Sequence, residues 1–119
     1  MSSHDVTQLE NTGVEELDRL PFGVAQLAAD GTVRHLNRAE AARLGVQRWR
    51  AIGRNYFRDL AGSAAPSLSQ AARSLAPGER THLALSLAGY RWNREGTAVE
   101  VDLWRSTSGK LLLCVHPSS

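Results

Sequence analysis

The stretch that decides the fold is residues 20–61, LPFGVAQLAADGTVRHLNRAEAARLGVQRWRAIGRNYFRDLA. Residues 22–28, near its start, have the apolar character of a β-strand. Asp30-Gly31 follows, and it is a strong turn signal because glycine accepts a positive φ without a steric penalty. Residues 32–36 then return as a second strand, so the pattern predicts a β-hairpin.

The second half of this stretch predicts short helices. Asn37 is a favoured N-cap residue with Glu40 at the third helical position, and Gly45 suits the left-handed conformation that ends a helix. Further helical segments are expected at residues 49–52, 56–61 and 67–75.

The remainder of the chain alternates as strands do. Leucines alternate with small residues over positions 83–87, and apolar residues alternate with acidic ones over 99–103. Turns at 93–96 and 106–109 precede these later strands, the last of which is an apolar segment at 111–115. The expected fold class is α+β, with a five-stranded antiparallel sheet and short helices on one face.

The N-terminal part divides into a polar lead and a short helix. We expect residues 1–11 to be a flexible lead and residues 12–117 to form a single domain. Thr12 and Glu15 have the spacing of a capping box, and Pro21 ends the helix. The helix either packs on its own sheet or contributes to a homodimer, which we favour. The candidate interface residues are Val14, Leu17, Leu20 and Trp104.

The composition fits one domain. With 119 residues, of which 42% are hydrophobic, the chain can bury one core and is too short for two. No apolar run approaches the roughly 18 residues of a membrane span, and the polar N-terminus lacks the features of a secretory signal. Cys114 is the only cysteine, which excludes an internal disulfide and fits a reducing compartment. We therefore expect a cytoplasmic protein that does not engage a membrane.

Positive charge is concentrated in residues 43–58, which hold five arginines on a chain of net charge +2. Such a segment can meet an acidic partner or nucleic acid, but a solvated helical face is the more common outcome. No helix-turn-helix, zinc-finger or RNA-binding signature accompanies it, so we expect no nucleic-acid partner. The role of this segment stays open on sequence grounds.

The order of the elements and several short phrases resemble a PAS sensor domain, and most of all the photoactive yellow protein family. The similarity is closest over residues 17–63 and is one of pattern beyond them. Its clearest pieces are Phe22-Gly23, Gln26-Leu27, Asp30-Gly31, Asn37, Ala39-Glu40, Gly45, Ile52-Gly53 and Asn55-Tyr56-Phe57. The resemblance implies a sensory or regulatory domain.

The residues that hold the chromophore in that family are mostly replaced here. The cysteine that carries a hydroxycinnamoyl thioester is matched by Ser63, whose hydroxyl is a far poorer nucleophile than a thiolate. Leu36 stands where the family has a tyrosine, and Leu44 and Val46 stand where it has a threonine and an arginine. Glu40 is retained. A buried phenolate would lack the donors that offset its desolvation, so we expect no covalent hydroxycinnamoyl chromophore. These five residues form the candidate ligand pocket.

Other cofactors are not expected either. Tyr56 fills the position at which flavin-binding relatives carry a cysteine, so no cysteinyl–flavin adduct can form. Residues 67–75 lack the histidine that heme-binding relatives use, and the four histidines of the chain are too scattered for metal-ligand spacing. A non-covalent small ligand stays open.

Glu40 has two interpretations. As a pocket acid it would bond a ligand hydroxyl. As the residue three positions after Asn37 it would be a capping-box partner, with its carboxylate returning to the Asn37 N–H. The spacing favours the capping box.

Two functions are compatible with the sequence. The leading hypothesis is a sensory module that binds a small apolar ligand and signals by protein contact, with the output in a protein partner. The alternative is a ligand-free interaction or dimerisation module that acts as an adaptor in a larger assembly. An internal cavity would favour the first and a packed interior the second. No catalytic constellation is evident, so enzymatic activity is not expected.

Overall fold

The computed structural model describes residues 13–60, 65–87 and 97–117. The expected flexible lead, Thr12, Ser63 and the expected turn at 93–96 therefore lie outside the described residues.

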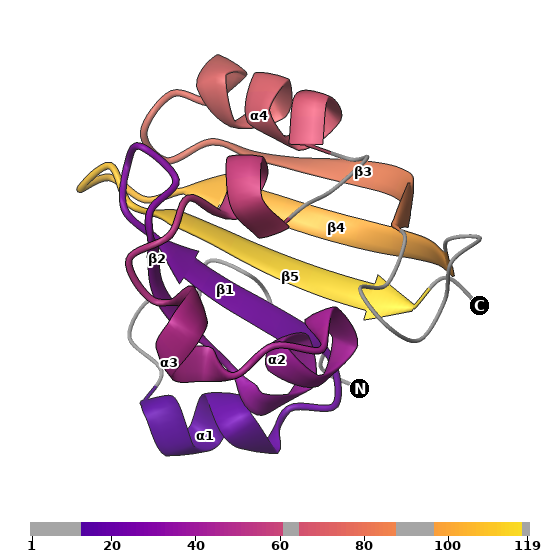
Figure 1. The fold of residues 1–119 in the computed structure, drawn as a ribbon. Coiled ribbons are helices and arrows are strands. Elements are labelled where there is room, and N and C mark those ends of the chain that lie inside the picture. The colour runs from indigo at the N-terminus through magenta and orange to yellow at the C-terminus, as the bar shows by residue number, and fades with distance from the viewer. Residues whose placement is uncertain (1–12, 61–64, 88–96, 118–119) are drawn as a thin grey trace.

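One antiparallel sheet organises the chain (Figure 1). Its strands lie in the order β2-β1-β5-β4-β3, so the first hairpin sits at one edge and the last strand of the chain pairs with the first. The strands are β1 Gly23–Leu27, β2 Val33–Leu36, β3 Arg80–Leu87, β4 Thr97–Arg105 and β5 Leu111–Pro117. The five-stranded antiparallel sheet predicted from alternation is confirmed.

Four helical segments cover one face of this sheet, as expected. They are α2 Arg38–Leu44, α3 Arg48–Ala51, the π-helical turn η2 Tyr56–Leu60 and α4 Ala65–Ser74. Figure 1 shows α2 and α3 near the β1 end of the sheet and α4 beside β3. Apolar side chains from every strand and from these helices form the main core. Its largest fully buried members include Leu27, Leu36, Tyr56, Leu68 and Leu103.

The first helix, α1 Val14–Arg19, covers the opposite face. Leu17 packs in a second cluster with side chains that alternate away from the main core, namely Val24, Leu112, Cys114 and Trp104, together with Phe22. Of the two arrangements that the sequence allowed, the helix thus packs on its own sheet. Its N-cap is Gly13, whose carbonyl oxygen accepts the Leu17 N–H at 3.0 Å.

Asn37 joins three elements at one buried point. Its Oδ1 accepts hydrogen bonds from the backbone N–H of Glu40, as an N-cap should, and from that of Val24 in β1. Its Nδ2 donates to the backbone oxygens of Leu17 in α1 and Phe22, at 2.8 and 3.0 Å. The side chain is fully buried, and its two donor and two acceptor positions are all hydrogen-bonded. The N-cap predicted from the sequence therefore also ties together α1, β1 and α2 through hydrogen bonds.

The β1–β2 turn positions the helical segment that follows. Gly31 has φ of 95°, as the turn prediction required, and a Cβ there would press on the Phe57 ring. Its carbonyl oxygen accepts the Tyr56 N–H at 2.9 Å, and Val33 exchanges backbone hydrogen bonds with Gly53 and Arg54. This backbone pairing holds the start of η2 against the hairpin.

Candidate functional site

A carboxylate, a guanidinium and a phenol meet beneath the helices. Glu40 of α2 is fully buried, and its carboxylate accepts two hydrogen bonds from Arg43, at 2.9 Å from Nε and 2.6 Å from an Nη atom. The Tyr56 hydroxyl donates to the same carboxylate at 2.6 Å and accepts from Arg43 at 3.3 Å. We refer to Glu40, Arg43 and Tyr56 as the buried triad. Charge-assisted, bidentate bonding of this kind satisfies a buried carboxylate without any ligand.

The protonation states of the triad follow from its burial. Burial alone would lower the pKa of Arg43, but the hydrogen bonds and charge of Glu40 raise it above its usual value. Burial raises the pKa of Tyr56 well above its ordinary range, and the neighbouring Glu40 charge adds to the effect. The guanidinium therefore stays charged and the phenol stays neutral.

The capping-box interpretation of Glu40 is wrong in its second half. The Glu40 N–H does bond the Asn37 side chain, but the Asn37 N–H donates to the Val24 carbonyl oxygen instead of the Glu40 carboxylate. The carboxylate turns into the core beside Gly23, where a Cβ would collide with its Oε1. The side chain is thus a buried polar group with its own partners.

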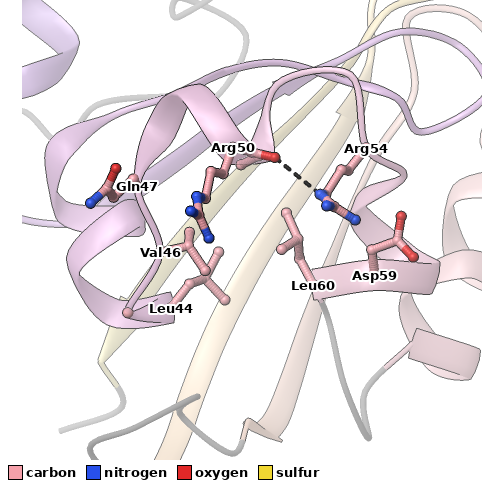
Figure 2. Close-up of a pocket in the computed structure, with 9 residues that line it drawn as sticks. Leu44, Val46, Gln47, Arg50, Arg54, Asp59 and Leu60 are labelled. Carbon is pink, nitrogen blue, oxygen red and sulfur yellow. Dashed lines mark hydrogen bonds between the residues drawn. The ribbon is translucent and has the colours of Figure 1, made fainter.

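A pocket of about 480 Å³ opens between the end of α2, α3 and η2, and no member of the buried triad lines it. Figure 2 shows its apolar part, where Leu44, Val46 and Leu60 face the cavity. Arg50 and Arg54 stand at its side, with the Arg54 Nε donating to the Arg50 carbonyl oxygen at 3.1 Å. Its volume is in the range of small-molecule sites, and its lining combines apolar side chains with two cationic ones and one acidic one, Asp59.

The predicted pocket residues separate into two groups. Leu44 and Val46 line this open pocket. Leu36 and Glu40 have no exposed surface and belong to the packed interior. Ser63 lies outside the described residues, so its position relative to either group is not part of the structure.

The predicted interface residues also separate. Leu17 and Trp104 are buried in the second cluster of the same chain, with Leu20 packed beside them. Only Val14 is an exposed large apolar side chain, with 54% of its surface accessible.

Sequence reasoning missed the surface of α3. Trp49 lies on α3 and Ile52 is the C-cap residue of that helix, three positions later; they are 68% and 50% exposed. The Arg50 guanidinium lies 5.0 Å from the centre of the Trp49 ring. The spacing was visible in the sequence, but equal spacing also marks a buried face, so only the packing distinguishes the two.

Histidines and carboxylates gather on the face of the sheet that α2–α4 do not cover. His82 contacts Asp102 at 2.7 Å and Glu100 at 2.8 Å, and His116 lies 3.8 Å from Asp102. The hydrogen bond to Asp102 raises the pKa of His82. Among the described residues, no group of three or more histidine, cysteine or acidic side chains is arranged to hold a metal ion. No helix in the same part of the chain has the length and apolarity to cross a membrane.

The comparisons with known proteins agree with this architecture. The family description of the PAS fold matches residues 17–116. The chain belongs to the PAS fold family. This match confirms the resemblance to PAS domains that the sequence predicted. PAS domains are sensory modules.

Several solved PAS domains are similar in fold. The photoactive yellow protein domain of the sensor histidine kinase Ppr from Rhodospirillum centenum has a TM-score of 0.71 at 22% identity, covering 92% of this chain and 96% of its own. The PAS domain of an HTR-like protein from Haloarcula marismortui has a TM-score of 0.67 at 22% identity, with coverage of 86% and 90%. The PAS domain of the quorum-sensing receptor RpfR from Cronobacter turicensis, in complex with BDSF, has a TM-score of 0.65 at 15% identity, with coverage of 85% and 97%. No curated protein sequence matches the chain.

Proposed function

We propose that this PAS domain is a regulatory module that acts by contact with a protein partner and holds no ligand in its interior. The buried triad carries the proposal, because Glu40 is the one retained polar group of the chromophore pocket and its carboxylate is already bonded by Arg43 and Tyr56. Leu36, which stands where the family has a tyrosine, is also fully buried. A ligand could reach this carboxylate only by displacing the Tyr56 phenol and breaking well-formed bonds.

The output of such a module lies in another protein or in another part of a larger assembly. Ppr, one of the proteins with a similar domain, is a sensor histidine kinase. By analogy, this domain would change its contacts to alter the activity of a partner, and no covalent hydroxycinnamoyl or cysteinyl–flavin group takes part. The domain itself performs no chemical reaction.

A homodimer stays a prediction within this proposal. Leu17 and Trp104 are buried in one chain, so they would contribute to a dimer only if α1 were exchanged between two copies. A dimer that leaves α1 in place would use the exposed part of the same sheet face and Val14.

The open pocket supports a second candidate function, the sensing of a small amphipathic anion. Leu44, Val46 and Leu60 would contact an apolar chain, and Arg50 and Arg54 would contact its acidic group. A PAS domain of RpfR has been solved in complex with C12:0, which makes a saturated fatty acid a suitable probe.

Native mass spectrometry, combined with an absorption spectrum, distinguishes the two functions. For protein purified from its own host we expect the mass of the bare chain, no absorption beyond the aromatic band and no adduct after addition of dodecanoate. The second candidate requires a dodecanoate complex that the uncharged dodecanol does not form and that Arg50→Ser/Arg54→Ser abolishes. A co-purified small molecule, or visible colour, would contradict the leading proposal.

A further inference from the structure

The α3 surface brings together exposed large apolar side chains and two arginines that form no salt bridge among the described residues. We define it as Trp49, Arg50, Ile52 and Arg54. Apart from Val14 on α1, Trp49 and Ile52 are the only large apolar side chains among the described residues with half or more of their surface exposed. Tryptophan and arginine are also the residues most enriched among those that dominate binding energy at protein interfaces.

The arginines of this region are not equivalent. Residues 41–58 contain five arginines and no acidic residue. Three of the five have carboxylate partners, since Arg43 pairs with Glu40, Arg48 with Asp18 and Arg58 with Asp59.

Arg50 and Arg54 are the two without one. Within the described part of the chain neither forms a salt bridge: the Arg50 guanidinium lies over the Trp49 ring, and the Arg54 Nε donates to the Arg50 carbonyl oxygen. Both flank the pocket whose apolar part is Leu44, Val46 and Leu60. Asp59 lines the same pocket, and its pKa is lowered chiefly by its hydrogen bond to Arg58 and to a smaller extent by the charge of Arg54. Two cations without a salt bridge of their own therefore stand between an apolar pocket and two exposed apolar side chains.

We propose that the α3 surface is the docking site for an acidic segment of a protein partner. An apolar side chain of that segment enters the pocket, its carboxylates meet Arg50 and Arg54, and its flank packs on Trp49 and Ile52. This inference rests on the proposed function, because it names the contact surface and the chemistry of the partner. Two cations without salt bridges beside an apolar pocket suit such a peptide better than a phosphate backbone, which needs a longer track of cations.

The test uses a displayed library of random peptides, each about 16 residues long, selected against the intact chain. We expect the enriched sequences to carry net negative charge and a recurring apolar or aromatic residue. The most enriched sequence is then synthesised with a fluorescent label, and its affinity is measured by anisotropy.

Matched variants show whether this surface holds the peptide. Trp49→Ala and Arg50→Ser/Arg54→Ser should each weaken binding at least about tenfold. Val14→Ala removes the other exposed apolar side chain, and Arg19→Ser/Arg73→Ser removes two exposed arginines elsewhere, so both controls should stay within about twofold of the unmodified chain. All substituted residues are exposed, and a dispersed amide spectrum confirms that each variant folds.

The remaining outcomes overturn the inference in distinguishable ways. Peptides that bind the outer face of the sheet, mapped by chemical-shift changes, refute the α3 surface but leave a protein-contact function intact. Failure to enrich any peptide, together with a dodecanoate complex, refutes both. Enriched peptides without net negative charge, or a DNA oligonucleotide that competes at Arg50 and Arg54, refute the acidic partner.

Discussion

At the scale of single residues, Tyr56 gives this PAS interior its distinctive character. Its hydroxyl donates a hydrogen bond to the Glu40 carboxylate, the group that a ligand hydroxyl would otherwise contact. The bond depends on a neutral phenol, because an ionised one would place a second negative charge beside Glu40 in a fully buried site.

This dependence predicts a loss of stability at high pH. The folded chain keeps the Tyr56 proton because its pKa is raised, whereas the unfolded chain releases that proton near the ordinary value of about 10. Above that value the unfolded state binds fewer protons, so the free energy of unfolding falls by about 1.4 kcal/mol per pH unit.

Tyr56→Phe isolates this contribution. Near pH 9 we expect the variant to be about 1.5 kcal/mol less stable than the unmodified chain, which is typical of a lost hydrogen bond to a charged group. The gap should close on going to about pH 11, as measured by urea unfolding at each pH. A gap that stays constant over this range would show that the phenol is not held neutral by the fold.

The single-residue features that the sequence predicted are those set by the local backbone. The turn glycine Gly31, the N-cap Asn37 and the left-handed Gly45 each depend on only a few neighbouring residues. Tyr56 as a partner of Glu40 was missed for the opposite reason. Tyr56 is sixteen positions away and reaches Glu40 only because η2 is pinned to the first hairpin.

At the scale of elements, Asn37 is the tie that holds α1 in place. The helix has six residues, too few to be stable alone in water, so its position depends on Leu17 and on the Asn37 amide that bonds its last turn. A change that keeps the shape of this side chain but removes its donors should release α1 while retaining the N-cap of α2.

Asn37→Asp makes that change. The remaining oxygen still accepts from Val24 and Glu40, but the second oxygen faces the carbonyls of Leu17 and Phe22 with nothing to donate. We expect a loss of about 3 kcal/mol in the free energy of unfolding, with faster hydrogen exchange in α1 than in the sheet.

Asn55→Asp is the matched control for this prediction. The Asn55 amide donates to a single carbonyl, that of Asp30, at an exposed site. Its replacement should cost less than about 1 kcal/mol. Equal costs for the two variants would mean that the buried amide of Asn37 is not the tie.

The elements themselves were largely predictable because period-two alternation and turn glycines specify strands and their ends. The exposure of α3 was not, since Trp49 and Ile52 have the spacing of a buried helical face. Which face a four-residue helix buries depends on its neighbours, and α3 rests on β2 through Ala51 instead.

At the scale of the whole molecule, the two faces of the sheet are unequally covered. One face carries the main core beneath α2, α3, η2 and α4, and the other carries the smaller cluster beneath α1. The outer part of that second face is polar, with His82, Glu100 and Asp102 exposed or partly exposed. We therefore predict that association between copies depends on whether α1 stays on its own sheet.

Deleting residues 1–20 tests this control. The deletion removes Leu17 and uncovers Val24, Leu112 and Trp104 on the sheet. Exposed apolar surface of this kind promotes association, so we expect the truncated chain to form larger species than the full-length chain at equal concentration, as measured by light scattering. Leu17→Ser is the milder control and should shift the mass in the same direction. If instead the full-length chain is a dimer and the deletion converts it to a monomer, α1 is exchanged between two copies. The packing of α1 on its own sheet would then be replaced in the dimer by the same packing on the sheet of the second copy.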